Sequence, residues 1–336
     1  MKRPWFYPFV PFYAAAAAWK NGRFDRDASA ATELKWPVLS VGSLSIGGAG
    51  KTPLVTALVP LLRDAGFMPD ILSRGYGRTT KETLRVDPQG QAIDFGDEPL
   101  MLARTTGAPV YVAAERVRAG RLAEIQLDAW QQHVHLLDDG FQHRQLARAL
   151  DVVLFTHEDA YDHMLPAGNL REPLQSLRRA NVIAVREEEA TELEDVLSRL
   201  ARPGTKVWTI RRTLRVPAAS SKPFAFCALA RPWHFFAQLR MQNITANHTM
   251  TFRDHHHYSQ KDIEKLLRIA KSSGANGWIT TMKDAVKLPA AMLHQLQQIG
   301  PVSVADLRTE FVDREIVIRD LKQMLARWQE KMPSGQ

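Results

Sequence analysis

A glycine-rich stretch has the composition of a phosphate-binding loop. The sequence SVGSLSIGGAGKTP covers residues 40–53 and ends in Gly50, Lys51 and Thr52 before a proline. Backbone N–H groups of such a turn point at phosphate oxygens, and the positive end of the next helix adds to the attraction. In this pattern Lys51 would bridge the terminal phosphates and Thr52 would hold Mg²⁺. The alternative is a glycine turn with a structural role only.

The loop departs from the usual spacing of this motif at one position. Ser45 stands where the first glycine is expected, and Gly47 and Gly48 supply backbone freedom instead. The strand expected before the loop and the helix expected after it favour phosphate binding over a structural turn. The residues assigned to the nucleotide phosphates are therefore Ser45, Gly47, Gly48, Ala49, Gly50, Lys51 and Thr52.

Two adjacent carboxylates end an apolar run in the sequence HLLDDGFQH. Asp138 and Asp139 are expected at the carboxyl edge of the sheet that carries the phosphate loop. In phosphoryl transfer, carboxylates at that edge position Mg²⁺ or its waters. Gln142 and His143 follow within a turn, and His143 reads equally well as a simple cap and as a member of the site.

Two further stretches could supply a general base. The sequence GDEP places Asp97 and Glu98 just before a helix expected to begin at Pro99, which is also an ordinary capping arrangement. The sequence FRDHHHYS collects three histidines and a carboxylate, but consecutive residues cannot all face one metal ion. A histidine that orients or tunes a carboxylate base is the better functional interpretation, and a polar surface loop is the alternative.

The composition indicates a globular protein with a basic surface. The 336 residues are 45% hydrophobic and 24% charged, and the formal net charge is +8. Nucleic acid, anionic lipid and a phosphorylated substrate could each explain that charge. Because no lysine/arginine block or nucleic-acid motif stands out, we expect no nucleic-acid partner. The single cysteine, Cys227, excludes an intrachain disulfide and fits a reducing cytosolic compartment.

The first twenty residues, MKRPWFYPFVPFYAAAAAWK, are rich in aromatic side chains. The uncharged run is shorter than the roughly 20 apolar residues that a transmembrane helix needs, and two prolines interrupt it. Tryptophan and tyrosine favour the headgroup depth of a bilayer. The segment over residues 1–22 is therefore predicted to be an interfacial helix on the cytoplasmic face of a membrane. The alternatives are a secretory signal and a helix that packs on its own domain.

Apolar runs that alternate with amphipathic patterns predict an α/β fold with a largely parallel sheet. Strands are expected at 37–43, 68–74, 109–114, 133–140, 150–156 and 180–186, and helices at 51–65, 116–125 and 192–200, the last with Thr191 as its N-cap. After a linker at 215–223, strands follow at 224–230, 277–281 and 301–307, with helices from Pro232 and over 313–328. We expect a P-loop NTPase-like domain over 23–220 and a smaller, lid-like α/β domain over 221–330.

Several blocks together resemble the tetraacyldisaccharide 4′-kinase family, the lipid A 4′-kinases of Gram-negative bacteria. They are residues 40–53, GDEP, LLDDGFQHRQLARALDVV at 136–153, LPAGNLREPL at 165–174, FRDHHHYS and TTMKDAVKL at 280–288. The resemblance runs to about residue 310. It implies a kinase on the cytoplasmic face of the inner membrane that uses ATP and Mg²⁺. Its substrate would be an acylated disaccharide phosphate lipid, phosphorylated at the 4′-hydroxyl to give lipid IV-A, with no obligate protein partner evident.

The resemblance also implies roles for individual residues. Asp97 resembles the base that takes the hydroxyl proton, with His255 as its partner from the second domain. Lys51, Asp138 and Asp139 resemble further catalytic groups, and Arg116 and Arg171 resemble cations near the phosphates or the anionic substrate. The residues that resemble a Mg²⁺ and phosphate set are Thr52, Asp138, Asp139, Gln142 and Glu172.

Two other classes of protein share some of these features. A membrane-peripheral ATPase of the MinD/ParA kind also has a Gly-Gly-x-Gly-Lys-Thr loop, but its additional lysine before the glycine pair is Ile46 here. A non-catalytic lipid-binding protein with a vestigial nucleotide fold would not need Lys51, Thr52 and the paired carboxylates. The chain also departs from the 4′-kinase pattern at Ala49, which removes one possible hydroxyl contact, and at Arg231-Pro232 and Met282. We assign no nucleobase contact to Arg231-Pro232 and no role to Met282.

Overall fold

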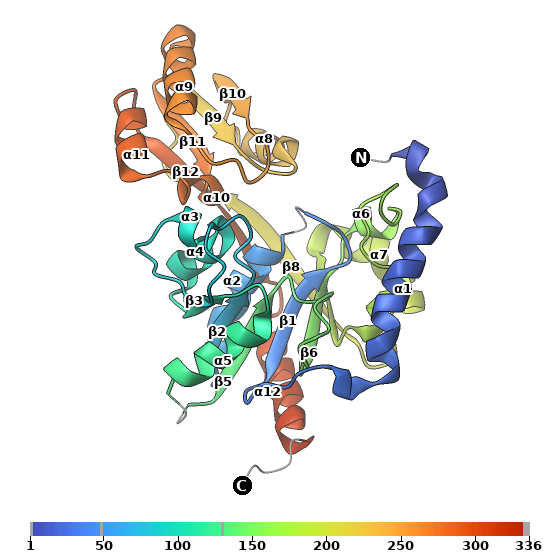
Figure 1. The fold of residues 1–336 in the computed structure, drawn as a ribbon. Coiled ribbons are helices and arrows are strands. Elements are labelled where there is room, and N and C mark those ends of the chain that lie inside the picture. Colours follow the sequence, from blue (N-terminus) through green and yellow to red (C-terminus); the bar gives the residue numbers. More distant parts are fainter. Residues whose placement is uncertain (1–2, 48–49, 129–130, 332–336) are drawn as a thin grey trace.

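The computed structural model describes residues 3–47, 50–128 and 131–331, and they form two units joined through one sheet (Figure 1). Within these residues twelve strands pair in the order β10-β9-β11-β12-β8-β7-β6-β1-β5-β2-β4-β3. Most neighbouring pairs are parallel, and the antiparallel pairs are β12 with β8 and β3 with β4. The α/β fold with a mostly parallel sheet flanked by helices, expected from the sequence, is confirmed.

The larger unit is built on parallel strands around β1. The strands are β1 (Val38–Ser43), β2 (Met68–Ser73), β3 (Leu84–Arg85), β4 (Val110–Val112), β5 (His133–Asp138), β6 (Leu150–Leu154) and β7 (Val182–Arg186). All six residues of β1 and of β5 are buried, which explains why their sequences read as continuous apolar runs rather than alternating ones. The carboxyl ends of β1 and β5 lie side by side because the two strands are parallel neighbours.

Helices cover both faces of this part of the sheet. They are α2 (Lys51–Asp64), α3 (Ala92–Phe95), α4 (Asp97–Thr106), α5 (Arg116–Gln126), α6 (His157–Ala160) and α7 (Ala190–Leu200), with 3-10 turns η2 (Ala28–Ala30), η3 (Leu174–Arg179) and η4 (Glu187–Glu189). Leu54, Leu58 and Leu62 are fully buried, one turn apart on α2, and pack with Leu39 of β1. This spacing gives α2 the apolar stripe of a helix that lies on a sheet.

The smaller unit lies beyond the phosphate-loop edge of the larger one (Figure 1). It contains β9 (Pro223–Cys227), β10 (His248–Thr251) and β11 (Gly277–Thr281), with helices α8 (Pro232–Met241), α9 (Gln260–Ser273), α10 (Met282–Ala285) and α11 (Ala290–Gln297). Its core includes the fully buried rings of Phe224, Phe226 and Trp278. The element α10 lies at the junction and contacts α4 of the larger unit.

Two long strands connect the units. β8 (Lys206–Arg215) and β12 (Val302–Phe311) pair antiparallel over much of their length, and β12 also pairs with β11 of the smaller unit. The chain then returns in α12 (Arg314–Lys331), where Val317, Leu321 and Leu325 join the core of the larger unit. The domain boundary near 220 stays a prediction, and the packing places α12 with the larger unit rather than with residues 221–311.

The N-terminal segment lies along the outside of the larger unit (Figure 1), and its Tyr7 ring lies 5.0 Å from the ring of His163 in the loop after α6. It forms η1 (Pro4–Phe9) and α1 (Val10–Arg26), in which no residue is buried. Polar contacts hold it: Arg144 pairs with Asp25 at 2.7 Å, and the Tyr13 hydroxyl donates to the backbone oxygen of Arg171. Its exposed rings are Trp5, Phe6, Tyr7, Phe9, Phe12 and Trp19. Within residues 3–47, 50–128 and 131–331, no helix is both long and apolar enough to cross a membrane.

Several elements differ from the sequence expectations. The long connecting strand β8, the edge strand β10 and helix α9 were not predicted, although α9 has a complete capping box between Ser259 and Asp262. Thr191 is not an N-cap, because α7 begins at Ala190, two residues earlier than expected, with Glu189 in the cap position. Helix α4 begins at Asp97 rather than at Pro99, so both acidic residues of GDEP lie in its first turn.

Candidate active site

The phosphate loop connects the end of β1 to the start of α2. Gly50 is the N-cap of α2 and has φ of 104°, a left-handed conformation that residues with side chains rarely adopt. A Cβ at this position would also lie 3.3 Å from the guanidinium of Arg212. Gly47 has φ of 63°, while Gly48 and Ala49 lie outside the described residues. The loop therefore uses glycine where the backbone conformation requires it, as the motif predicts.

Lys51, Asp139 and Arg171 form a charged group beside this loop. Lys51 Nζ lies 3.5 Å from Asp139 Oδ1, and Arg171 donates to both carboxylate oxygens of Asp139 at 2.7 and 3.1 Å. Burial alone would raise the pKa of Asp139, but Lys51 and Arg171 outweigh it and lower that pKa to about 2. Asp139 therefore stays ionised and holds both cations close to where phosphates would bind.

The segment that carries Arg171 also fixes the backbone of the loop. The backbone N–H of Ile46 donates to the oxygen of Asn169 at 2.9 Å, and the N–H of Arg171 donates to the oxygen of Leu44 at 2.7 Å. The Arg171 side chain adds a bond of 3.1 Å to the backbone oxygen of Ser45. The Ser45 hydroxyl hydrogen-bonds to Asp159, so Ser45 links the loop to α6.

Asp138 and Gln142 lie at the end of β5 in a more buried environment. Burial, with the nearby charges of Glu98 and Asp139, raises the pKa of Asp138 to about 7. Gln142 donates from Nε2 to the backbone oxygen of Ser43 at 3.0 Å, while its buried Oε1 has no hydrogen-bond partner among the described residues. A buried carboxyl and an unpartnered amide oxygen therefore lie together at the end of β5.

Arg116, Glu172 and His143 occupy different places around this group. Burial, with the nearby cation Arg74, lowers the pKa of Arg116 to about 10, and Asp138 and Asp139 are close enough to oppose that shift. Burial, with Arg116 next, lowers the pKa of His143 to about 4, so this imidazole is neutral at pH 7. The buried carboxylate of Glu172 pairs with Arg179 at 2.6 Å. Its role at a metal stays a prediction.

Asp97 and His255 meet across the junction of the two units. Gly96, with φ of 93°, lets the chain pass close to residues 75 and 76, and Asp97 follows it into the first turn of α4. His255 Nδ1 lies 3.0 Å from Asp97 Oδ2 and 3.2 Å from Oδ1. The two side chains are 158 residues apart in the sequence. The structure therefore brings together the pair expected from the sequence.

The surroundings of this pair shift both pKa values. The bond to Asp97, opposed mainly by burial, raises the pKa of His255. Burial would raise the pKa of Asp97, but the bond from His255 and the charge of Lys283 outweigh it and lower that pKa. Asp97 is therefore ionised at neutral pH, and it contacts the His255 imidazole, which can carry a proton.

Sequence reasoning did not assign a role to Lys283 or Asp254. Lys283, on α10, lies 3.2 Å from Glu98 Oε1 and 3.3 Å from Asp254 Oδ1. Lys283 lies in the block TTMKDAVKL, whose only interpretation from the sequence was the family resemblance. The sequence did contain a signal for a helix start here: Thr281 is the N-cap of α10, and the cap fixes the directions of the side chains that follow it.

Asp139 and His255 share an unusual backbone conformation. Their φ values are 50° and 57°, and only two other non-glycine residues of the described chain, Ala218 and Asn243, also have positive φ. Left-handed backbone at a residue with a side chain carries strain, which persists where the surrounding structure enforces it and is often found at functional sites. Asp139 lies beside the phosphate loop, and His255 lies at the contact with Asp97.

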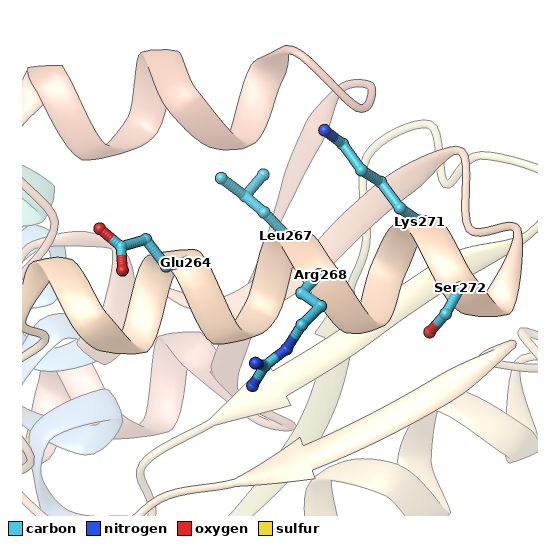
Figure 2. Close-up of a pocket in the computed structure, with 5 residues that line it drawn as sticks. All are labelled: Glu264, Leu267, Arg268, Lys271 and Ser272. Carbon is cyan, nitrogen blue, oxygen red and sulfur yellow. The ribbon is translucent and has the colours of Figure 1, made fainter.

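A hollow on the smaller unit is unrelated to these groups. It has a volume of about 650 Å³ and lies along α9, where it is lined by Glu264, Leu267, Arg268, Lys271 and Ser272. Figure 2 shows that all five side chains come from this one helix. Because no sequence-predicted site residue lines the hollow, we assign no function to it. Within residues 3–47, 50–128 and 131–331, no three His, Cys, Asp or Glu side chains gather as a metal cluster.

A phosphate loop after the central strand, with acidic residues at the carboxyl end of the neighbouring strand, defines the class of P-loop kinases. A family model described as tetraacyldisaccharide-1-P 4′-kinase (LpxK) matches residues 2–326. The chain belongs to this family, and it is an enzyme that transfers phosphate. Neither the MinD/ParA-type ATPase nor the non-catalytic alternative is favoured.

Individual relatives agree with this assignment over nearly the whole chain. A tetraacyldisaccharide 4′-kinase of Koribacter versatilis is 39% identical over 96% of this chain and 99% of its own. One from Chlorobium chlorochromatii is 36% identical, over 84% of this chain and 82% of its own. A crystal structure of LpxK from Aquifex aeolicus, described as an "apo" form in complex with ATP, has a TM-score of 0.75. It is 30% identical and covers 96% of this chain and 98% of its own.

Proposed function

We propose that this protein transfers the γ-phosphate of ATP to the 4′-hydroxyl of a tetraacylated disaccharide 1-phosphate, giving lipid IV-A. The observation that supports the proposal most is the contact between Asp97 and His255, a carboxylate–histidine pair of the kind that can act as a general base. Glu98, the neighbour of Asp97, acts electrostatically on Asp138 at the end of β5. The base and the phosphate-binding groups therefore belong to one site.

Asp97 is the group that removes the hydroxyl proton. An alcohol is a poor nucleophile until its proton leaves, and this happens late in a loose phosphoryl transfer. The 4′-oxygen forms a bond to the γ-phosphorus, the bond from that phosphorus to the β,γ-bridging oxygen breaks, and ADP leaves. The proton passes to the Asp97 carboxylate, where His255 Nδ1 is within hydrogen-bonding distance of both oxygens.

The charges around the loop bind and orient the triphosphate. Lys51 and Arg171 are held 3.5 and 2.7 Å from Asp139, so their charges are in place before the nucleotide arrives. Amide groups at the start of α2 add the positive end of a helix. Arg116 lies within electrostatic range of the same carboxylates and adds a further cation. Preorganised charges of this kind stabilise the transition state without reorganisation during the reaction.

Oxygen-bearing side chains near Lys51 fit a magnesium ion. The partnerless Oε1 of Gln142 and the buried carboxyl of Asp138 are hard donors of the kind that Mg²⁺ prefers. We assign Thr52, Asp138, Asp139 and Gln142 to hold the ion directly or through water, with Glu172 as a supporting group through Arg179. When bound, the ion would neutralise charge on the β- and γ-phosphates.

The site operates at a membrane surface on the cytoplasmic side of the inner membrane. Trp5, Phe12 and Trp19 are 89%, 75% and 82% exposed, although large aromatic side chains are usually buried. They favour the headgroup region of a bilayer, which would also hold the acyl chains of the substrate. The polar contacts of α1 with the larger unit tie this anchor to the site.

Transfer of label from γ-labelled ATP to the disaccharide lipid, separated by thin-layer chromatography, tests this function. Purified protein with tetraacyldisaccharide 1-phosphate and Mg²⁺ should give labelled lipid, and omission of the lipid should leave ATP largely intact. Label released only as inorganic phosphate, at a rate that the lipid does not change, would favour an ATPase switch and contradict the proposal.

A further inference from the structure

Lys283 lies at the centre of the contact between the two units, and all of its hydrogen-bonding capacity is used there. An ammonium group has three protons to donate. Around Lys283 Nζ lie three acceptors: Glu98 Oε1 at 3.2 Å, Asp254 Oδ1 at 3.3 Å and His255 Nε2 at 3.3 Å. The side chain is only 16% exposed. One acceptor belongs to α4 of the larger unit and two belong to the loop 252–259 of the smaller one.

These bonds determine where the proton of His255 lies. Because Lys283 can only donate, His255 Nε2 must accept, and a neutral imidazole then carries its proton on Nδ1. That is the nitrogen 3.0 Å from Asp97 Oδ2. In this tautomer His255 donates to the Asp97 carboxylate, whereas in the other tautomer two lone pairs would face each other. The ring of Tyr76, 5.0 Å away, packs against the imidazole.

We propose that Lys283 is a positioning residue for phosphate transfer, which holds His255 in the tautomer that orients Asp97 toward the substrate hydroxyl. The inference rests on the proposed role of Asp97 as the base. Lys283 does not touch the reacting atoms. It acts through His255 and completes the contact only when the smaller unit is placed against α4.

The charge of Lys283 also limits how easily His255 becomes protonated. The charged and titratable groups that face the pair are Asp97 and Glu98 from α4, Asp254 from the loop, and Lys283 and Lys287 from the region of α10. Asp97 and Asp254 favour an imidazolium, and the nearby ammonium of Lys283 opposes it. Because Lys283 lowers the pKa of both His255 and Asp97, its loss should raise both, and the proposed base should then become protonated at a higher pH than in the wild type.

The test compares Lys283→Met, Lys283→Arg and the matched surface control Lys271→Met in the full chain. For Lys283→Met we expect kcat to fall roughly tenfold to a hundredfold at neutral pH, because the base is misoriented. The acidic limb of the kcat profile should move up by about one pH unit, with the KM for ATP unchanged. Lys283→Arg keeps the charge and should keep the limb near its wild-type position.

A fall in kcat with an unmoved acidic limb would mean that Lys283 is only a packing residue, and wild-type kinetics would also overturn the inference. A second measurement needs no stable variant: ¹⁵N NMR of histidine-labelled wild-type protein, with His255 assigned from His255→Asn. We expect a protonated Nδ1 and an unprotonated Nε2, and the reverse pattern would overturn the proposal. Near-normal turnover of Asp97→Ala would instead remove the proposed base, while the NMR result would still decide on Lys283.

Discussion

The two halves of the site are assembled in different ways. The phosphate half comes from one unit, where Lys51, Asp139 and Arg171 lie on segments that parallel strands and backbone bonds hold together. The transfer half joins Asp97 of α4 to His255 of the smaller unit, and Lys283 completes it from α10. The first half is present whenever the larger unit is folded. The second half exists only when the two units are correctly placed.

This difference suggests a reason for separating binding from chemistry. A base that is complete only when the units meet would limit the transfer of phosphate to water before the lipid is bound. The phosphate half can be preformed without that risk, because holding a nucleotide does not by itself activate an attacking group. Substitutions in the two halves should therefore have different effects on nucleotide affinity and on turnover.

The largest expected effect is that of Asp97→Ala. Loss of the base should reduce kcat by roughly 10²- to 10⁴-fold, while the Kd for ATP measured by calorimetry stays nearly the same. Asp94→Ala, on the neighbouring α3, is the matched control and should keep its turnover. If Asp97→Ala weakened ATP binding as strongly as it slowed turnover, the division into two halves would be wrong.

The stability of the larger unit should depend on pH through the buried His135, independently of both halves of the site. Burial alone would lower the pKa of His135, but Asp70 and then Glu124 outweigh it and raise that pKa to about 9. A folded pKa above the unfolded one adds stability that is complete below pH 6.5 and is lost as the pH rises through 9. A shift of this size corresponds to about 3 kcal/mol at most.

The measurement is the free energy of unfolding in urea between pH 6 and pH 10. We expect His135→Gln to be less stable than wild type at pH 6 and to lose most of the pH dependence over this range. Its kcat profile should keep the wild-type acidic limb, since His135 lies three residues before Asp138 on β5 and bonds to Asp70 and Glu124 rather than to residues of the site. A shifted limb would show that the core and the site titrate together.

A smaller effect is expected from Lys51→Ala. Removing a charged donor from the phosphate half should raise the Kd for ATP by roughly ten- to a hundredfold, as for a lost charge-assisted hydrogen bond. Calorimetric titration measures it, with the exposed Lys81→Ala as the control. An unchanged Kd would place the nucleotide elsewhere.

The smallest expected effect is on membrane association. Replacing Phe12 and Trp19 together by serine should lower partitioning onto anionic vesicles by about tenfold, because two exposed rings would no longer enter the interface. Sedimentation with vesicles measures this. Ile125→Ser, which removes an 80% exposed apolar side chain from α5, is the control. Unaltered sedimentation of the double variant would favour a helix that serves only to pack on its own domain.

The residues of the proposed phosphate half could be picked out from the sequence because their signals are local. Residues 40–53 are a continuous motif, and β5 ends in the two carboxylates that the fold places beside it. The transfer half was predicted only through the family resemblance, because no local pattern indicates that residues 97 and 255 meet. Lys283 was missed for the same reason. The connecting strand β8 was missed because its burial alternates, unlike the continuous apolar runs of β1 and β5.

The most direct test of the account is a crystal structure with a non-hydrolysable ATP analogue. We expect the triphosphate to lie on the amides of residues 47–52, with the γ-phosphate near Lys51 and on the side of the site that faces Asp97 and His255. A triphosphate bound away from this loop, or a γ-phosphate pointing away from the Asp97–His255 pair, would contradict the account.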